Sequence, residues 1–333
     1  MTFMPDNRLL SRGGRRPWIA AVAAAAVAFA LAGCAGQAPV AEETSSAPTV
    51  DIDADFFFQE GDIPADPERV VVLWRTGSSL AELGVVPVGA LEGELSENEL
   101  TPEQFAPVSD VPVVGTYEGV DIEKIIELDP DLIIGMDNGG LSIDYEELAE
   151  LFPVAILSIA EPTDVWRNYE TVAQLVGKSA DFTTQHEALT ERLDALNAEY
   201  GDELGATQST ILGGLEGQIW VDTSKSLAYD RLTAAGFGYN PAYTDNPERY
   251  VEELTRENIP TLADQDIIFF DAELDGSTPA DVQAILDEPA FQELPAVVAG
   301  HLYPIRGATV YTFTAANLQV DDLAAAAKAF TGR

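Results

Sequence analysis

The 333-residue sequence holds one cysteine, two histidines and few basic residues, and each scarcity excludes a class of chemistry. A single thiol cannot form an internal disulfide. Neither His186 nor His301 has a second histidine or a cysteine at ligand spacing, so we expect no zinc or manganese site. With 57 acidic residues against 17 basic ones, the formal charge is −40. Such a surface repels phosphate backbones, so we expect no nucleic-acid partner.

Motifs of common enzyme sites are also missing from the sequence. There is no Gly-x-Ser-x-Gly elbow that would present a nucleophilic serine. The segment 177–179 ends like a phosphate-binding loop, but Val172 stands where that motif requires glycine. His186 lies on the apolar side of a helical pattern, so we predict a core position for it. We therefore predict no catalytic residue and no cofactor, and a protein that is not an enzyme.

The first 33 residues have the parts of an export signal. A basic region runs through Arg16, and the apolar run 18–32 is about 15 residues long, short of the roughly 20 that span a bilayer. It ends in Leu-Ala-Gly followed by Cys34, an arrangement similar to a bacterial lipobox. We therefore expect cleavage after residue 33 and lipidation of Cys34. Residues 34–50, which have no apolar periodicity, are expected to form a flexible tether.

The mature chain is expected on the outer face of the cytoplasmic membrane, held there by its lipid anchor. From Cys34 onward, 13 basic residues stand against 56 acidic ones, a formal charge of −43.

A long helix is predicted over 179–204, at the midpoint of the mature chain. Gly177 and Gly205 bound it, and at about 1.5 Å per residue it would be roughly 39 Å long. Its apolar positions recur at steps of three and four, as in a single helical stripe: Phe182, His186, Leu189, Leu193, Leu196, Tyr200 and Leu204. A helix of this length is expected to act as a strut between two lobes that move by small rocking.

Apolar strands alternate with short helices on both sides of this helix. The segments 122–134 and 257–270 share one plan, a short helix followed by an acidic stop and a buried strand. The pattern predicts an α/β fold with two Rossmann-like lobes, whose mainly parallel sheets are joined by the single long backbone helix. We expect an N-terminal lobe over 51–162, a helical connector over 163–204 and a C-terminal lobe over 205–333.

Ligands of open α/β sheets bind outside the carboxyl ends of the strands. The segments that follow the predicted strands in both halves are rich in aromatic, basic and amide side chains. Eight of them are candidate ligand-binding residues: Trp74, Arg75, Tyr117, Asn138, Trp220, Arg306, Tyr311 and Phe313.

Five segments along the mature chain carry a family resemblance: 67–73, 83–89, 123–134, 288–292 with Tyr303-Pro304, and 321–323. With the lipobox and the midpoint helix, they make the chain similar to class III substrate-binding lipoproteins of ABC importers, the iron-siderophore and cobalamin group. The resemblance implies a lipid-anchored protein, expected as a monomer, that captures a ferric siderophore and delivers it to a membrane permease. It also implies that Glu123 and Glu257, one in each half, dock on that permease.

In this family the aromatic candidates would supply broad apolar walls, and Arg75 and Arg306 would meet the oxygens of the chelate. Cobalamin and haem remain open as ligands; haem would use Tyr117 or Met136 as its axial ligand. The shortage of histidine disfavours a metal-ion binding protein, and the missing nucleophile and base disfavour an extracellular hydrolase.

Overall fold

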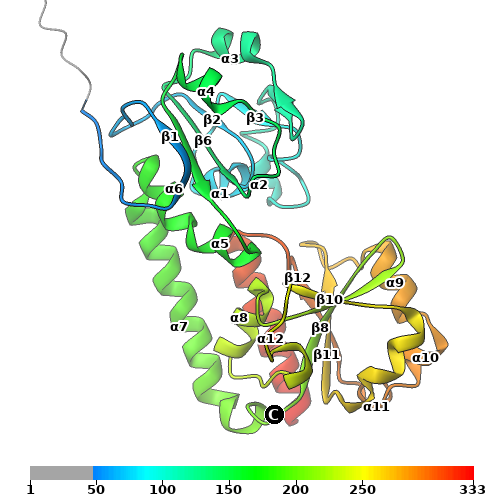
Figure 1. The fold of residues 1–333 in the computed structure, drawn as a ribbon. Helices are drawn as coiled ribbons and strands as arrows, with labels where there is room; N and C mark the ends of the chain where they lie inside the picture. Colours follow the sequence, from blue (N-terminus) through cyan, green and yellow to red (C-terminus); the bar gives the residue numbers. More distant parts are fainter. Residues whose placement is uncertain (1–47) are drawn as a thin grey trace, which may run out of the picture. The chain divides into compact units, whose positions relative to one another are not determined.

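The computed structural model describes residues 48–333 (Figure 1). The predicted export signal, Cys34 and nearly all of the predicted tether lie outside the described residues. Within 48–333, no helix combines the length and the apolar character needed to cross a membrane.

The first sheet of the described region has seven strands in the order β1-β7-β6-β2-β3-β4-β5. The four central pairings, β7-β6, β6-β2, β2-β3 and β3-β4, are parallel, while β1 and β5 pair antiparallel at the edges. All residues of β2 and β6 are buried, as expected for strands covered on both faces. The strands are β1 (Phe56–Glu60), β2 (Val70–Val72), β3 (Gly89–Leu91), β4 (Val113–Thr116), β5 (Gly119–Val120), β6 (Leu132–Asp137) and β7 (Val154–Ser158).

Short helices connect these strands, and two of them begin at an aspartate cap. The Asp121 carboxylate accepts a hydrogen bond from Lys124 N at 3.0 Å, and that of Asp144 accepts one from Glu147 N at 3.0 Å. The helices of this first lobe are α1 (Gly77–Glu82), α2 (Pro102–Phe105), α3 (Ile122–Leu128) and α4 (Tyr145–Ala149). Two more, α5 (Pro162–Arg167) and α6 (Tyr169–Leu175), follow β7.

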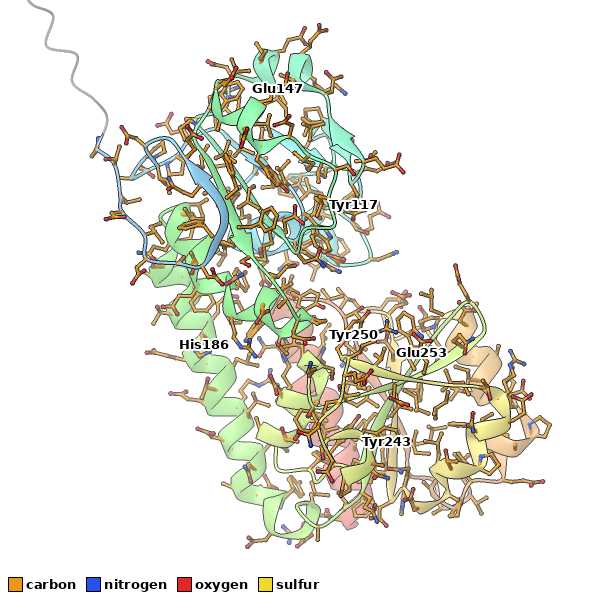
Figure 2. All side chains as sticks on the ribbon, viewed as in Figure 1. Tyr117, Glu147, His186, Tyr243, Tyr250 and Glu253 are labelled. Carbon is orange, nitrogen blue, oxygen red and sulfur yellow. The ribbon has the colours of Figure 1, made fainter. Side chains whose placement is uncertain are left out.

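The predicted long helix is confirmed as α7 (Ser179–Leu204). Six of its seven predicted stripe residues are buried, but the core position predicted for His186 is wrong, because this side chain is exposed. At 100° per residue His186 lies about 40° around the helix from Phe182, the same angle as the buried Leu204, so its exposure is set by packing along the helix rather than by the stripe. Its ring stacks on Phe182 at a centroid distance of 5.5 Å instead of entering the core, and Figure 2 shows His186 on α7.

The second sheet has five strands in the order β10-β9-β8-β11-β12. β8, β11 and β12 are parallel, whereas β9 and β10 extend the sheet with antiparallel pairings. The α/β class is therefore confirmed, with a second sheet that is mixed. Its strands are β8 (Ser209–Leu215), β9 (Gln218–Asp222), β10 (Val251–Leu254), β11 (Ile267–Ala272) and β12 (Leu302–Arg306).

Both α-helices and 3₁₀ segments cover the second sheet and complete the second lobe (Figure 1). Glu257, expected on a short helix, lies in a 3₁₀ segment that contains Pro260. The helices are α8 (Leu227–Ala234), α9 (Ala280–Leu286), α10 (Pro289–Gln292), α11 (Pro295–Val298) and α12 (Phe313–Thr331), with the 3₁₀ segments η1 (Pro241–Tyr243) and η2 (Arg256–Asp264).

The two lobes are joined by a partly buried carboxylate as well as by α7. Glu82, the last residue of α1, accepts hydrogen bonds from the backbone of Phe313 at 2.6 Å and Thr314 at 3.0 Å, at the start of α12. The Tyr169 hydroxyl donates to the same carboxylate at 2.6 Å. Burial raises the pKa of Glu82 above its ordinary value, while these hydrogen bonds lower it. The contact fixes the first turn of α12 to the first lobe.

Candidate ligand-binding site

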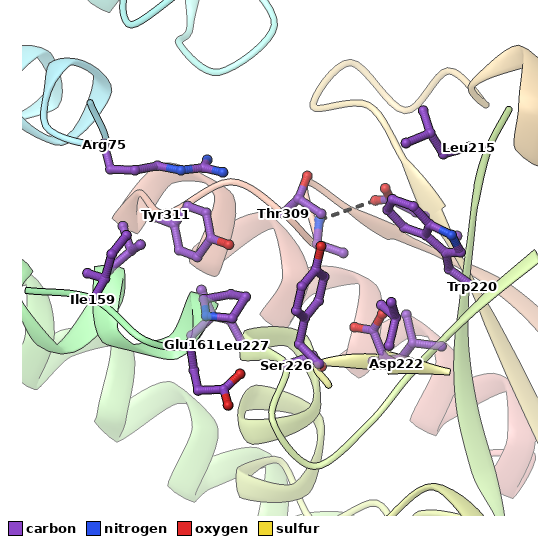
Figure 3. A pocket seen from close by; sticks show the side chains of 18 of the residues that line it. Arg75, Ile159, Glu161, Leu215, Trp220, Asp222, Ser226, Leu227, Thr309 and Tyr311 are labelled. Carbon is purple, nitrogen blue, oxygen red and sulfur yellow. Dashed lines mark hydrogen bonds between the residues drawn. The ribbon is translucent and has the colours of Figure 1, made fainter. Parts of the chain in front are cut away.

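A cavity of about 500 Å³ is lined by both lobes and by the start of α5 (Figure 3). Its volume is in the range of small-molecule sites. The polar and aromatic residues of its lining are Trp74, Arg75, Asn138, Glu161, Trp220, Asp222, Ser226, Tyr250, Asp271, Thr309 and Tyr311. The cavity therefore combines aromatic walls with both signs of charge.

Arg75 is held between two aromatic rings on the first-lobe side of the cavity. Its guanidinium carbon lies 5.2 Å from the centroids of both Trp74 and Tyr311, within cation–π range. The residue has a φ of +65°, a left-handed conformation that costs a non-glycine residue roughly 1–2 kcal/mol. Such strain is typical of functional positions.

The backbone next to Arg75 is fixed by Glu94. Its carboxylate accepts hydrogen bonds from Thr76 N at 3.1 Å and Gly77 N at 3.2 Å, and so caps the start of α1. Burial raises the pKa of Glu94 to about 7, although backbone hydrogen bonds from Arg75 and Gly77 lower it. A side chain at residue 77 would not fit, because its Cβ would lie 2.5 Å from the Glu94 carbonyl oxygen. Glu94 thus orients the turn that presents Arg75.

The second-lobe side of the cavity is built on one face of the sheet. Gly213 of β8 is opposite Trp220 of β9, and the register of β8 with β11 places Asp271 on its other side. A Cβ built at Gly213 would have only the Cβ of Trp220 within 4 Å, so the glycine leaves an open space between these neighbours. Asp222, two residues after Trp220, lies on the same face.

Two carboxyl groups on this face have raised pKa values. Burial and, to a smaller extent, the charge of Asp271 raise the pKa of Asp222 to about 7, although a hydrogen bond from Ser226 lowers it. Burial also raises the pKa of Asp271 to about 6, while the hydrogen bond from Ala308 N at 3.2 Å lowers it. The third acid of the lining, Glu161, is paired with Lys225 at 2.7 Å.

We expect Asp222→Asn to remove part of the pH dependence of folding. The folded-state pKa of Asp222 is above the unfolded value of about 3.9, so its stabilising contribution is complete below that value and is lost as the pH rises through about 7. Between pH 5 and pH 8, the free energy of unfolding of the wild type should fall by about 2 kcal/mol more than that of the variant.

Urea denaturation at the two pH values measures this difference. The matched control is Asp245→Asn, which changes an exposed aspartate outside the cavity lining and should follow the wild type. Parallel pH profiles for the wild type and Asp222→Asn would contradict the assignment.

The structure brings six of the eight predicted residues together. Five of them line the cavity: Trp74, Arg75, Asn138, Trp220 and Tyr311. Tyr117 lies beside it, with its ring 6.2 Å from that of Trp74 in an edge-to-face arrangement, and lines two smaller adjoining cavities. Tyr117 belongs to the first lobe and Tyr250 to the second (Figure 2).

Arg306 and Phe313 lie elsewhere, each for a physical reason. The Arg306 guanidinium is paired with Asp322 of α12 at 2.7 Å, so it fastens β12 to that helix. Phe313 is 1% exposed and packs against Trp166 and Phe182, at centroid distances of 5.0 and 5.3 Å. Met136, weighed as a haem ligand, is only 1% exposed and belongs to the core.

Sequence reasoning missed the cavity residues Glu161, Asp222, Tyr250, Asp271 and Thr309. Asp222 and Asp271 lie at or near the ends of strands, where ligand sites are expected. The sequence has 57 acidic residues, so a position near a strand end did not distinguish these two carboxylates from the others.

The two glutamates predicted to dock on a permease are both exposed, Glu123 in the first turn of α3 and Glu257 in η2. No group of three or more histidine, cysteine, aspartate or glutamate residues within 48–333 is placed to hold a metal ion.

Known proteins of similar sequence and structure give the chain its family. YhfQ of Bacillus subtilis strain 168, a lipoprotein assigned to substrate binding for an ABC transporter, is 25% identical over 261 residues, 73% of this chain and 77% of that protein. The Fe(3+)-citrate-binding protein YfmC of the same strain is 26% identical over 249 residues, 72% and 74% of the two chains.

Among solved structures, the siderophore periplasmic binding protein from the fuscachelin gene cluster of Thermobifida fusca superposes with a TM-score of 0.71. It is 27% identical and covers 80% of this chain and 98% of its own. The family model of the periplasmic binding proteins matches residues 70–309, which include the second sheet, all strands of the first sheet except β1, and most of the cavity lining. The chain therefore belongs to the periplasmic binding protein family.

Proposed function

We propose that this protein is the extracytoplasmic solute-binding component of an ABC importer and that it captures a ferric siderophore in the cavity between its lobes. The observation that carries the proposal is the cavity itself, where Arg75 lies among the aromatic residues Trp74, Tyr311, Trp220 and Tyr250. Aromatic rings offer apolar surface to the body of a chelate, and a guanidinium recognises its carboxylate, catecholate or hydroxamate oxygens. Binding of this kind is reversible and requires no catalytic residue.

The names of relatives support the same proposal. YfmC is named for ferric citrate, the Thermobifida structure for a siderophore, and YhfQ as a lipoprotein of an ABC transporter. The last name agrees with lipidation at Cys34, which would hold the protein at the outer face of the membrane near its permease.

Tryptophan fluorescence tests the ligand class, because Trp74 and Trp220 both line the cavity. We would titrate the protein with ferric trihydroxamate, ferric catecholate and ferric citrate, and with cobalamin and haem. Sub-micromolar quenching by at least one ferric chelate is expected. Quenching by cobalamin or haem alone would refute the siderophore assignment.

The variant Gly213→Leu tests whether the chelate binds in this cavity. The open space above Gly213 accepts a side chain without a backbone clash, so the variant should fold normally while its leucine occupies the cavity. Unchanged affinity in this variant would show that the chelate binds elsewhere.

For the permease, we expect charge reversal at Glu123 and Glu257 to reduce uptake while ligand affinity stays the same. The two exposed carboxylates are accessible to basic residues of a partner, and neither lines the cavity. Uptake of radioactive iron by cells that carry Glu123→Lys/Glu257→Lys, with fluorescence titration of the purified variant, separates the two effects. The control is Glu187→Lys/Glu199→Lys on exposed positions of α7. An equal loss of affinity and uptake would disprove the docking role.

A further inference from the structure

The two sides of the cavity carry opposite charges. Arg75 is the only basic residue of the lining, and it belongs to the first lobe. Asp222 and Asp271 belong to the second lobe, and Figure 3 shows Arg75 and Asp222 on opposite sides of the pocket. A ligand that reaches across the cavity therefore meets a cation at one end and carboxylates at the other.

The acidic side has no cation of its own. Among the described residues, the ion pairs of the lining join Glu161 to Lys225 and leave both aspartates without a basic partner. Asp222 has Ser226 as a side-chain hydrogen-bond partner, and Asp271 accepts from backbone N–H groups. Such uncompensated carboxylates in a partly buried site favour a positively charged group from outside.

The sheet geometry leaves room for that group. Asp222 and Asp271 lie on strands that flank β8 on either side, about 10 Å apart across the sheet, and the register offsets them by two residues along the strands. Gly213, which lies between Trp220 and Asp271, contributes no side chain, and the space above it is open. Trp220 and Tyr250 also line this part of the cavity, and their rings would add cation–π attraction to an ammonium or guanidinium.

We infer that the ligand of this protein is a zwitterionic chelate, whose oxygen-rich iron-binding part meets Arg75 and whose amine or guanidinium lies between Asp222 and Asp271. The inference rests on the proposed function and narrows its substrate class. The raised pKa of Asp222 agrees with it, since burial and the neighbouring Asp271 charge are the costs that a bound cation would offset.

A matched pair of chelates tests the inference. Ferric desferrioxamine B ends in a primary ammonium, and its N-acetyl derivative has the same hydroxamate chelate without that charge. The wild type should bind the ammonium form about tenfold to a hundredfold more tightly, the range for a hydrogen bond to a charged group. In Asp222→Asn/Asp271→Asn this preference for the ammonium form should disappear.

The charge-matched control is Asp194→Asn/Asp202→Asn, which removes two exposed carboxylates of α7 and should keep the wild-type preference. If ferric chelates bind the wild type without preference for the ammonium, or only amine-free chelates bind, the zwitterion inference falls and the proposed function stands. If no ferric chelate of the hydroxamate, catecholate or citrate classes binds, the proposed function fails and this inference fails with it.

Discussion

Glu82→Ala is expected to lower the free energy of unfolding by about 3 kcal/mol, because it leaves the Phe313 and Thr314 amides without this acceptor, while the Tyr169 hydroxyl keeps the Ser79 carbonyl oxygen. The Phe313 and Thr314 amides and the Tyr169 hydroxyl all donate to this carboxylate, and they come from two parts of the chain far apart in sequence. An unpaired buried donor costs about 1–3 kcal/mol, more than the small net gain of a single hydrogen bond. Urea denaturation at neutral pH measures the loss.

A second variant separates the charge from the shape of this side chain. Glu82→Gln keeps the volume and one acceptor oxygen, so its loss should be smaller than that of the alanine variant. The control is Glu187→Ala, at an exposed position of α7, which should change stability by less than about 0.5 kcal/mol. A loss below 1 kcal/mol in Glu82→Ala would show that the carboxylate does not join the lobes energetically.

The Glu82 contact also bears on how the two lobes move relative to each other. The apolar stripe predicted one connection, the helix over 179–204, and the structure has that helix with the predicted bounds. The second connection, from the end of α1 to the start of α12, bridges 231 positions of sequence at its Phe313 hydrogen bond. Two connections resist a wide hinge motion more than one does, so small rocking of the lobes remains the expectation.

The sequence predicted the helices and strands whose positions depend on residues close together in the chain. Periodicity located α7, and the shared plan of 122–134 and 257–270 located the helix α3 and the buried strands β6 and β11. Contacts between residues distant in sequence could not be predicted, because they depend on how the elements pack. Arg306 ends a strand as a ligand residue would, yet its guanidinium pairs with Asp322, 16 residues later on α12. His186 matched the stripe spacing, but no neighbouring element covers it.

The candidate site was predictable to the extent that strand ends and side-chain types determine it. Trp74 and Arg75 follow β2, Trp220 lies within β9, and all three carry chemistry that is unusual for a surface. The aspartates of the second lobe were not recognised, because their role depends on Gly213 and on the register of three strands. The sequence shows these carboxylates, but it does not show the open space above Gly213.

Arg75→Gly should separate ligand binding from stability more sharply than any other single change in the cavity. Glycine adopts the φ of +65° without steric cost, so the roughly 1–2 kcal/mol of backbone strain disappears. The variant also loses two cation–π contacts, each worth about 0.5–1 kcal/mol at a partly exposed site. Because these terms offset each other, the free energy of unfolding should change by less than about 1 kcal/mol.

Ligand affinity should respond very differently, because the only basic residue of the cavity lining is gone. For an anionic ferric chelate we expect a dissociation constant about a hundredfold higher, the loss of charge-assisted hydrogen bonds worth about 1.5–3 kcal/mol. Arg75→Lys keeps the charge but not the planar fork or the stacking between rings, so it should recover only part of the affinity. Fluorescence titration and urea denaturation of the same preparations give both quantities. Unchanged ligand affinity in Arg75→Gly would show that Arg75 does not contact the ligand, since the variant remains folded and the cavity keeps its aromatic walls.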